Sequence, residues 1–597
     1  MLAGEGGVQT TVLRRPSLER ADMLAVVALI GATGLVVPPV KPDGLYLGLD
    51  LSTQSITGVL LDSRLQPVRP ATSVNFDNSF PEYGTKAGMS VGKDGVVTSP
   101  VIMWLRALDA LFDELKGTGL LGRVAAVSCS GQQHGSVYWT QAGLETLSSP
   151  PASAARFADA LSDAFALTDC PIWADSSTQS ECDAIEAAFS DTRAGSTSGA
   201  AAVARLTGSR AYARFTGPQI AAISTRQPAA WAATERVSLV SSLGAALLTG
   251  RHQPVDTSDA SGTLLMDIRT RTWAPSMLTC GVMPPELEQR LGGPPVPSHK
   301  LVGTVSPFAA LASGLREGCV VAASSGDNPC AIAGLGLARA GDLALSLGTS
   351  DTLLGVAAAA AATPATEGHI MAHPTDPASI FGMLCYKNGG AARQAVRDER
   401  CEADWGLFDE ALRRAPPAND GVLGLSLPLP EITPIISRNG EWYVDGKGKL
   451  VPKSSLSTPQ LVRAVVEGRF LSMRARGGAI GLSGEGGRVL ATGGGSQSKA
   501  ILQIAADVFG APVHASNTPD AAAIGAARRA AYALALAAAQ REPHEMPYAD
   551  FLTESAGTSA QQLRVVAMPV PEAAAAYDDA LVARHTELED TVAAGER

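Results

Sequence analysis

The amino-acid sequence predicts an α/β protein made of two similar domains. Its 597 residues are several times the usual size of one domain, so two or more substantial cores are expected. Short apolar runs alternate with long alanine-rich helical stretches, which is the pattern of an α/β fold. The strand-like runs cover residues 45–50, 57–62, 124–129, 319–323, 343–347 and 488–492.

Two segments of the chain repeat one outline. "YLGLDLSTQSITGVLL" (46–61) and "LALSLGTSDTLLGV" (343–356) both contain an apolar strand, a tight turn of small polar residues and a second apolar strand. Because the two segments lie about 300 residues apart, we expect two domains that are built on one plan and face each other.

The composition excludes several classes of function. Hydrophobic residues make up 46% of the chain and charged residues 18%, with a net charge of -11, as in a soluble globular protein without a basic surface for nucleic acid. The eight cysteines show no CxxC pair, so we interpret them as reduced thiols rather than a disulfide framework. His369 and His373 would lie on one side of a strand, which leaves a metal site there as an alternative.

The first 44 residues have the character of an extension. Residues 23–40 carry no charge and follow Arg14, Arg15 and Arg20, as in a signal or anchor segment. Two glycines and two prolines interrupt this run, so we favour an extension outside the core, with a transit peptide as one form of it, over a membrane anchor. We therefore expect a cytoplasmic protein, or a plastid or mitochondrial one if the leader is a transit peptide, with no membrane contact in the catalytic body.

Both hairpin turns are suited to bind phosphate. Turns of small residues leave backbone N–H groups unpaired in a concave arrangement, and neighbouring hydroxyls add donors. The two turns comprise residues 52–54 and 348–350, and no GxxxxGK[ST] loop occurs in the chain. A purely structural turn is the alternative for each of them taken alone.

A carboxylate ends the first of these strands. Asp50 would repel phosphate groups bound at the adjacent turn, so a divalent cation between them is the economical explanation. Magnesium typically keeps several waters and takes one or two carboxylates plus phosphate oxygens. The alternative is a strand-end aspartate that caps the turn.

A second carboxylate follows another buried strand. In "GCVVAASSGDNPCAIAGLG", Asp327 lies between that strand and an Ala/Gly-rich helix. A kinase that phosphorylates an alcohol needs one carboxylate near the metal and another to accept the hydroxyl proton. Asp50 and Asp327 suit these two roles, and a helix N-cap is the alternative for Asp327.

A third stretch, "AAVSCSGQQHGSVYW" (125–139), suits a polyhydroxylated ligand. Its amides and the His134 imidazole can donate and accept hydrogen bonds, while Tyr138 and Trp139 cover an apolar face. Ser130 is not in a GxSxG elbow, which argues against a nucleophilic serine. A hydrogen-bonded core histidine is the alternative for His134.

At these residues the chain resembles the FGGY carbohydrate kinases of the actin and hexokinase-like superfamily. The match runs from about Leu45 to about Ala530 through "GLDLSTQS", "SGQQHGSVYW", "WADSSTQ", "LTGSRAYARFTGPQIA", "DTSDASGTLLMDI", "SSGDNP", "SLGTSDTLL" and "TGGGSQSKAILQIAADVFGAPV". Within the family, these blocks are most similar to the eukaryotic type that phosphorylates D-xylulose. The resemblance implies two ribonuclease H-like domains flanking a nucleotide- and sugar-binding cleft.

The resemblance also implies domain limits and residue roles. Asp327 would be the base acting on the terminal sugar hydroxyl, and Asp50 would hold hydrated Mg²⁺. The residues implied to contact the ketopentose are His134, Arg210, Asp327, Asn328 and Gln133. Those implied to contact ATP are Thr53 and Gln54 at the transferred phosphoryl group, Gly348 and Thr349 at the β-phosphate, and Gly494 and Gly495 near the nucleoside. The implied limits are an extension at 1–44, a sugar-binding domain at 45–340, a nucleotide-binding domain at 341–540 and a tail with a helix at 541–597.

The activity expected from the resemblance is ATP-dependent phosphorylation of D-xylulose by a monomer or homodimer with small-molecule partners. One alternative is a sibling kinase for ribulose, another pentulose or a polyol. Another is a non-catalytic sugar-binding protein of the same fold. Loss of Asp50 or Asp327 would be the mark of that second alternative, and both residues are present.

Overall fold

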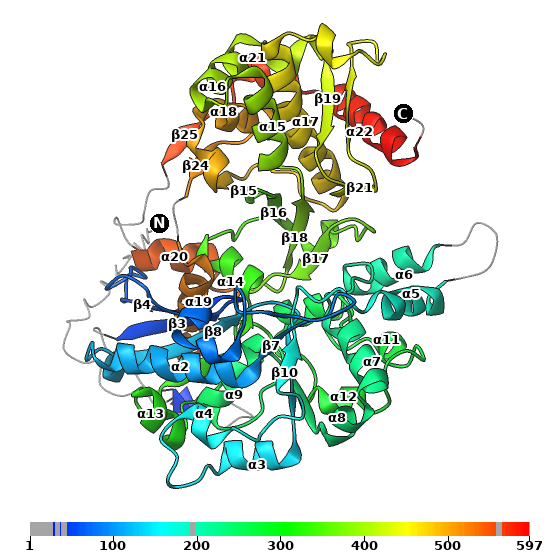
Figure 1. Cartoon of the computed structure of the whole chain (residues 1–597). Coiled ribbons are helices and arrows are strands. Elements are labelled where there is room, and N and C mark those ends of the chain that lie inside the picture. The colour runs from blue at the N-terminus through cyan, green and yellow to red at the C-terminus, as the bar shows by residue number, and fades with distance from the viewer. Residues whose placement is uncertain are drawn as a thin grey trace, which may run out of the picture.

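The computed structural model describes residues 44–190, 197–516, 519–556 and 564–595, with two short paired strands before them, β1 (Ala28–Leu29) and β2 (Val36–Val37). The predicted leader at 1–44 thus lies almost entirely outside the described residues. The chain forms two lobes, each built around a seven-stranded sheet (Figure 1). None of the helices in the described ranges is long and apolar enough to cross a bilayer.

The lower lobe in Figure 1, here called the N-lobe, contains the sheet formed by the first half of the chain. Its strands are, in spatial order, β12 (Leu301–Thr304), β13 (Val320–Ala322), β8 (Val124–Gly131), β3 (Leu45–Leu51), β4 (Ser55–Leu61) and β5 (Thr72–Asn75), with β14 (Ser325–Gly326) beside β8.

The upper lobe, here called the C-lobe, contains the second sheet. Its strands are, in spatial order, β17 (His369–Ala372), β18 (Ser379–Tyr386), β16 (Asp351–Ala358), β15 (Leu343–Leu347), β23 (Val489–Thr492), β24 (Val513–Ala515) and β25 (Val565–Ala567).

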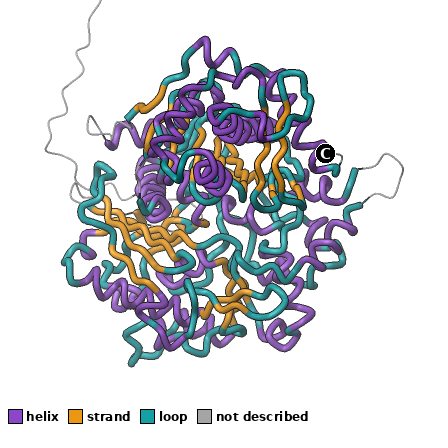
Figure 2. The backbone as a smooth tube through the Cα atoms, turned by 45° about the horizontal axis from the view of Figure 1, so that its top comes forward, coloured by secondary structure: helices purple, strands orange, loops and turns teal. Residues whose placement is uncertain are grey.

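The two sheets share one topology. In each, an antiparallel hairpin (β3–β4 or β15–β16) gains an antiparallel neighbour on one side, β5 or β18. On the other side each gains two parallel strands, β8 and β13 or β23 and β24. The internal repeat and the six strands predicted from the sequence are therefore confirmed. The strands form separate groups among the helices in Figure 2.

Helices cover both faces of the N-lobe sheet. Leu47 and Leu49 of β3 belong to the core cluster with helix α2, while Tyr46 lies in a second cluster on the opposite face with helix α19. Every residue of β3 is therefore buried, as is expected for a strand covered on both faces. The helices of the N-lobe are α1 (Phe76–Ser79), α2 (Val101–Lys116), α3 (Gln141–Ser148), α4 (Phe157–Ala160), α5 (Gln179–Ala188), α6 (Gly199–Thr207), α7 (Thr216–Arg226), α8 (Pro228–Ala233), α9 (Val240–Thr249), α10 (Thr257–Ala260), α11 (Pro275–Leu278), α12 (Leu287–Arg290), α13 (Pro307–Ser313), α14 (Asp327–Gly334), α19 (Ala521–Ala539) and α20 (Tyr548–Ala556).

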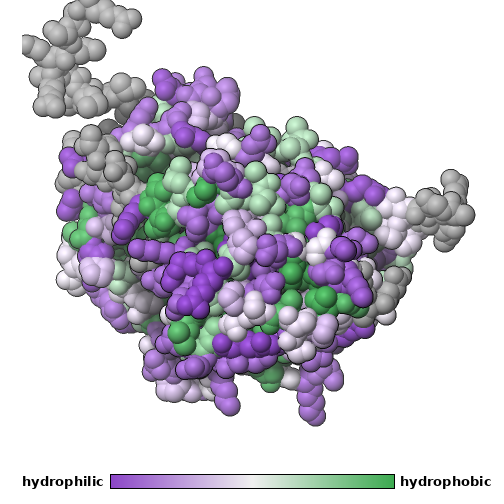
Figure 3. All heavy atoms as spheres, turned by 90° about the horizontal axis from the view of Figure 1, so that it is seen from above, coloured by the Kyte–Doolittle hydropathy of each residue, from purple (hydrophilic) through white to green (hydrophobic). Residues whose placement is uncertain are grey.

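The C-lobe carries the remaining helices, and smaller strand groups complete the fold. These helices are α15 (Gly390–Arg400), α16 (Trp405–Arg414), α17 (Thr458–Ala479), α18 (Lys499–Phe509), α21 (Pro571–Ala575) and α22 (Asp579–Ala593). The smaller groups are β6 (Ser90–Val91), β7 (Val97–Pro100) and β10 (Asp169–Pro171); β9 (Ser136–Trp139) and β11 (Arg236–Leu239); β19 (Leu423–Leu427) and β22 (Gly440–Val444); and β20 (Glu431–Ile432) and β21 (Ile435–Ile436). On the face shown in Figure 3, hydrophilic side chains surround small hydrophobic areas.

Helix α19 differs from the sequence-based domain limits. It lies within the predicted nucleotide-binding domain at 341–540, but it packs on the N-lobe sheet. A Cβ added at Gly48 of β3 would lie 1.8 Å from the Ala523 carbonyl oxygen, so the helix approaches the sheet as closely as a glycine allows. The predicted tail is likewise divided, because α20 packs beside α19 whereas β25 joins the C-lobe sheet. The packing of the lobes thus differs from the order of the chain, and the domain limits stay a prediction.

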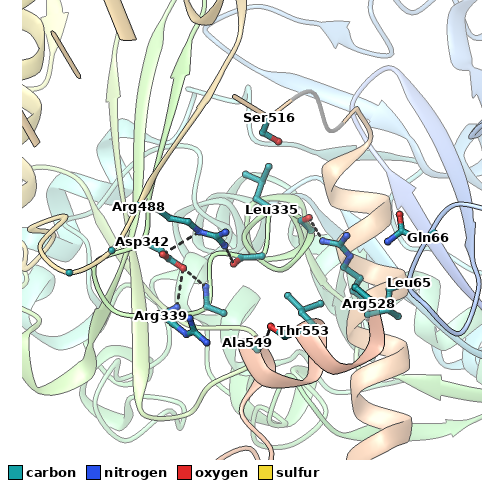
Figure 4. A pocket seen from close by; sticks show the side chains of 17 residues that line it. Leu65, Gln66, Leu335, Arg339, Asp342, Arg488, Ser516, Arg528, Ala549 and Thr553 are labelled. Carbon is teal, nitrogen blue, oxygen red and sulfur yellow. Dashed lines mark hydrogen bonds and ion pairs between the residues drawn. The ribbon is translucent and has the colours of Figure 1, made fainter. Parts of the chain in front are cut away.

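A cavity of about 380 Å³ lies where the connections between the lobes meet (Figure 4). Arg488 and Arg528 reach into it from opposite sides. Arg528 Nη1 donates to the Gly334 carbonyl oxygen at 2.6 Å, and Arg488 Nη2 donates to that of Gly336 at 2.8 Å. Both cations therefore hold the C-terminal end of α14, where the helix dipole is negative. Asp327 begins the same helix at its opposite end.

Candidate functional site

Asp50 lies near the end of β3, and its carboxylate is buried beside the turn that follows. The Ser52 hydroxyl donates to Asp50 Oδ2, whereas Oδ1 has no hydrogen-bond partner among the described residues. Burial raises the pKa of Asp50 above its ordinary value, and the Ser52 hydrogen bond partly offsets this effect. A buried carboxylate oxygen without a partner is free to bind a cation or an ordered water.

Other unpartnered polar groups lie close to Asp50. Ser130 pairs with Asp50 between β3 and β8, and Ser325 pairs with Ser130 between β8 and β14. Both hydroxyls and the amide of Gln132 are buried and lack hydrogen-bond partners within the described ranges. Buried polar groups are normally satisfied, so this cluster at the carboxyl ends of the strands is suited to hold water, an ion or a ligand.

Asp327 is placed beside this cluster by strand pairing. Gly326 of β14 pairs with Gly131 of β8, so the segments "SGQQH" and "SSGDN" end side by side. Asp327 Oδ1 accepts from the backbone N–H of Asn328 at 2.7 Å and from its amide Nδ2 at 3.1 Å. Burial, followed by the negative charge of Asp50, raises the pKa of Asp327 to about 7. Such a carboxylate can exchange a proton near neutral pH.

Asn328 and Gln133 form a direct pair across this junction. Asn328 Nδ2 donates to Gln133 Oε1 at 2.9 Å, joining residues 195 positions apart in the chain. This contact brings the "SGQQH" and "SSGDN" segments into one site, as the resemblance implied.

His134 follows directly and is a neutral acceptor. Its ring is buried and stacks on Phe215 with centroids 4.5 Å apart. Nδ1 lies 2.7 Å from the Gly262 carbonyl oxygen, and since a carbonyl only accepts, Nδ1 carries the proton. Burial, followed by the charge of Arg214, lowers the pKa of His134 to about 3. The remaining nitrogen, Nε2, is therefore an acceptor, and the φ of +71° at this residue is a strained backbone held for that placement.

Arg210 is the predicted sugar contact that the structure does not bring to this group. Its Nε and Nη2 donate to the two carboxylate oxygens of Glu186 at 3.1 and 3.0 Å. Arg214 is the nearer cation: it contacts His369 Nε2 at 2.6 Å and lowers the pKa of His134. Sequence reasoning missed Arg214, although it lies within the same motif, because the loop geometry decides which arginine faces inward.

The histidine pair considered as a metal site has other partners. His369 Nδ1 lies 3.0 Å from the Ser209 hydroxyl, and His373 Nε2 lies 3.0 Å from the Leu337 carbonyl oxygen. Within the described ranges, no group of three or more His, Cys, Asp or Glu side chains could hold a metal. Any magnesium site would therefore rest on Asp50 together with water and phosphate oxygens, which is the ligand set that this ion commonly uses.

The turn after β3 contains Thr53, which is half-buried, and Gln54, which is exposed. The Trp173 indole N–H donates to Thr53 Oγ1 at 2.8 Å, which orients the turn. A Cβ added at Gly88 would lie 2.0 Å from the Thr53 carbonyl oxygen, so the neighbouring loop also packs tightly on it. Trp173 was part of a recognised motif, but its contact with the turn could not be read from the sequence.

A second site lies in the C-lobe as a cavity of about 790 Å³. It is lined by Leu347, Gly348, Thr349, Gly390, Ala391, Arg393, Gln394, Trp405, Gly406, Asp409, Gly494, Gly495, Gln497, Ser498 and Ile501. All four glycine and threonine positions predicted to meet the β-phosphate and the nucleoside are among them. The cavity is large enough for a nucleotide.

A buried ion pair adjoins this cavity through Arg393, which lines it. Arg393 donates to Asp351 through Nη1 at 2.6 Å and Nη2 at 2.8 Å, and both side chains are almost fully buried. A Cβ added at Gly389 would lie 2.2 Å from the Asp351 carboxyl carbon, so only glycine fits there. Gly390 N–H also donates to the Gly348 carbonyl oxygen at 2.9 Å, which ties α15 to the turn after β15.

The N-terminus of α18 also opens on the cavity. Ser498 caps the helix by accepting from the Ile501 N–H at 3.1 Å, and it donates to Asp409 at 2.6 Å. A helix N-terminus favours anions, as the resemblance implied for this position. Trp405, 46% exposed and beneath the Arg397 guanidinium, is a lining residue that sequence reasoning missed.

Comparisons with known proteins agree with this arrangement. Residues 343–534 match the C-terminal domain of the FGGY family of carbohydrate kinases, and residues 160–334 match its N-terminal domain. A xylulose kinase of Mus musculus is 42% identical over 493 residues, which cover 82% of this chain and 86% of that protein. Xylulose kinase 2 of Arabidopsis thaliana is 39% identical over 502 residues, which cover 82% of this chain and 87% of that protein.

A solved structure has the same fold. The xylulose kinase from Rhodospirillum rubrum superposes with a TM-score of 0.69 at 20% sequence identity, covering 92% of this chain and 98% of that one. The two lobes with repeated topology, the paired aspartates and the sequence matches lead to one assignment. This chain belongs to the FGGY family of carbohydrate kinases.

Proposed function

We propose that this chain is an ATP-dependent kinase that converts D-xylulose to D-xylulose 5-phosphate. The observation that carries the proposal is the Asp327 carboxylate, held at the start of α14 beside Asp50 with its pKa raised to about 7. One carboxylate placed to accept the hydroxyl proton and a second one near the metal are what alcohol phosphorylation requires. Sequence identity of about 40% to xylulose kinases over most of the chain supports D-xylulose as the sugar.

In the proposed reaction, Asp327 accepts the proton of the terminal sugar hydroxyl. The hydroxyl oxygen forms a bond to the γ-phosphorus of ATP as the bond from that phosphorus to the β,γ-bridging oxygen breaks, and ADP leaves. The Asn328 hydrogen bonds to Asp327 Oδ1 fix the orientation of the carboxyl group, so the base is aligned before the sugar binds.

The sugar pocket is proposed to be built mainly from acceptors. His134 Nε2 can accept from one hydroxyl, because Nδ1 is committed to the Gly262 carbonyl oxygen. Gln133 and Asn328 supply a second polar edge beside Asp327. Arg210 would reach the sugar only by exchanging its bonds with Glu186, so its role stays a prediction.

The nucleotide is proposed to lie in the C-lobe cavity, with Gly348 and Thr349 at the β-phosphate and Gly494 and Gly495 near the nucleoside. Thr53 and Gln54, in the turn after β3, would meet the transferred group. Asp50, with its unpartnered Oδ1, would hold hydrated Mg²⁺. When bound, this ion would neutralise charge on the phosphate oxygens.

A coupled assay of ADP release tests the proposal across a panel of ketopentoses and polyols. D-xylulose should give the highest kcat/KM, and a higher value for ribulose or a polyol would reassign the substrate. Asp327→Asn should bind the sugar but lose about 10²- to 10⁴-fold in kcat, as expected for removal of a general base. Asp163→Asn, the same change at an exposed carboxylate, is the control. Near-normal turnover by Asp327→Asn would reject Asp327 as the base.

A further inference from the structure

A buried carboxylate that has no role in the proposed reaction contacts Gln133, a residue of the proposed sugar pocket. Asp259, in α10, is 1% exposed. Its Oδ2 accepts from the Ser241 hydroxyl at 2.5 Å, and its Oδ1 accepts from Gln133 Nε2 at 3.4 Å. Because Gln133 in turn bonds Asn328, Asp259 begins a chain of hydrogen bonds that ends at Asp327.

The direction of this chain follows from the chemistry of its members. Asp259 Oδ1 accepts when the carboxylate is ionised, and it still accepts when a proton lies on Oδ2 toward Ser241. Gln133 must therefore turn its NH₂ to Asp259, which leaves Oε1 for Asn328. Amide orientations are set by such networks, and here every partner agrees with one choice.

The same logic orients Asn328. Its Nδ2 spans Gln133 Oε1 at 2.9 Å and Asp327 Oδ1 at 3.1 Å, which uses both amide hydrogens. Asn328 Oδ1 has no partner among the described residues and is only partly buried, so it is available to the sugar as an acceptor. In a reversed chain, Asn328 Oδ1 would face Gln133 and Asp327, and the sugar would meet the donor Nδ2 instead.

The surroundings leave the chain little room. A Cβ added at Gly326 would lie 2.4 Å from Gln133 Cγ and 2.6 Å from Asp259 Oδ1. The charges that face Asp259 are those of Asp256, which lies 3.5 Å from Arg529, and of Asp327. Burial, followed by the charge of Asp256, raises the pKa of Asp259 to about 8. A buried acid that accepts hydrogen bonds from two specific donors can determine which way a neighbouring amide group points.

We propose that Asp259 is a positioning residue that, together with Asp327 at the other end of the chain, sets the polarity of the Gln133–Asn328 pair, so that Asn328 presents an acceptor to a sugar hydroxyl. The inference rests on the proposed function, because it assigns the sugar to this edge of the site. If Asn328 presents an acceptor, the sugar hydroxyl that meets it must donate the hydrogen bond. The residue acts through Gln133 and does not touch the substrate.

An exchange that keeps the shape of the side chain but removes its charge tests this polarity. In Asp259→Asn, the new amide can donate to Gln133 Oε1, which turns the Gln133 amide round. Asn328 then turns Oδ1 toward Gln133 Nε2 and Asp327, so that Nδ2 and no longer Oδ1 faces the sugar. The KM for the sugar should rise about 10- to 100-fold, with the KM for ATP unchanged. In the double variant Asp259→Asn with Gln133→Glu, the glutamate accepts from both neighbours, which restores the original direction at Asn328. Its sugar KM should return to within a few fold of wild type, although Gln133→Glu alone should be impaired.

Asp259→Asn, Gln133→Glu and their double variant form a double-mutant cycle, which distinguishes a positioning role of Asp259 from a merely structural one. Strongly non-additive effects with rescue in the double variant would support the inference. Additive effects, an unchanged sugar KM in Asp259→Asn, or equal changes in the sugar and ATP KM values would overturn it. Melting temperatures show whether a variant is folded, and Asp163→Asn is the matched control. If the wild type phosphorylates no sugar in the panel, the proposed function fails. The further inference is then tested by measuring the equilibrium affinity of the wild type and the three variants for the sugar.

Discussion

Asp327→Asn should make the protein more stable at alkaline pH while it removes turnover. In the folded protein the pKa of Asp327 is raised from 3.8 to about 7, first by burial and then by the charge of Asp50. A carboxyl whose folded pKa is raised contributes stability that is fully present below its unfolded pKa and is lost as the pH rises through the folded value. Asparagine cannot ionise, so the variant avoids that loss.

The size of the effect follows from the shift. About three pKa units at 1.36 kcal/mol each set a ceiling of roughly 4 kcal/mol on the cost of ionising this side chain in the fold. Part of that loss has already occurred at pH 5, so the ceiling between pH 5 and pH 8 is roughly 3 kcal/mol. The side chain is only partly buried and water screens its charge, so we expect about 1–2 kcal/mol.

Thermal unfolding of the wild type and Asp327→Asn at pH 5 and pH 8 measures this difference. The melting temperature of the variant relative to wild type should rise by about 1–2 °C from pH 5 to pH 8, since the unfolding entropy of a chain of 597 residues is large. Asp163→Asn should show no such trend. A relative melting temperature that stays constant, or that falls with pH, would refute the assignment of a raised pKa to Asp327.

Five further predictions concern Asp327, His134, Gly389 and Trp405. The wild-type kcat/KM for the sugar should fall about tenfold per pH unit below about pH 7, since protonated Asp327 cannot act as base; a flat pH–rate profile between pH 5 and 7 would contradict this. His134→Ala should raise the sugar KM about tenfold by removing a neutral acceptor. The wild-type ring should show no titration by NMR between pH 5 and 9, because its pKa is about 3, and a midpoint near 6.5 would be inconsistent with the buried geometry. Gly389→Ala should lower the free energy of unfolding, measured by calorimetry, by about 3 kcal/mol and should raise the KM for ATP, because the added methyl displaces Asp351 from Arg393. Gly122→Ala is the control and should behave as wild type, since its added methyl meets open space. Trp405→Ala should raise the KM for ATP roughly fivefold to tenfold without changing the sugar KM, and an equal effect on both would place the ring outside the nucleotide site.

The local parts of the site could be predicted from the sequence. The strand that ends at Asp50, the turn of small residues after it and the matching hairpin at 343–356 are encoded in consecutive residues. Periodicity, turn chemistry and strand-end carboxylates act over a few positions, so their conformations follow from residue order alone. The two hairpins that repeat in the sequence form the corresponding strands of two sheets with the same topology.

The partnerships between distant segments could not be predicted in this way. Asn328 meets Gln133 across 195 positions because β14 pairs with β8, and Asp259 joins them only because α10 packs against the same junction. The sequence also did not show that Arg214 rather than Arg210 lies near His134, since loop geometry makes that selection.

What the sequence by itself determined was the α/β class, the duplicated hairpins and the two aspartates at strand ends. The tertiary structure alone decided that α19 returns to the N-lobe sheet, that the cavity of the C-lobe includes Trp405, and that the buried carboxylate of Asp259 accepts a hydrogen bond from Gln133. The physical reason is the distance along the chain over which each effect acts. Backbone conformation responds to neighbouring residues, whereas burial, pKa and hydrogen-bond direction depend on which distant strands and helices pack together.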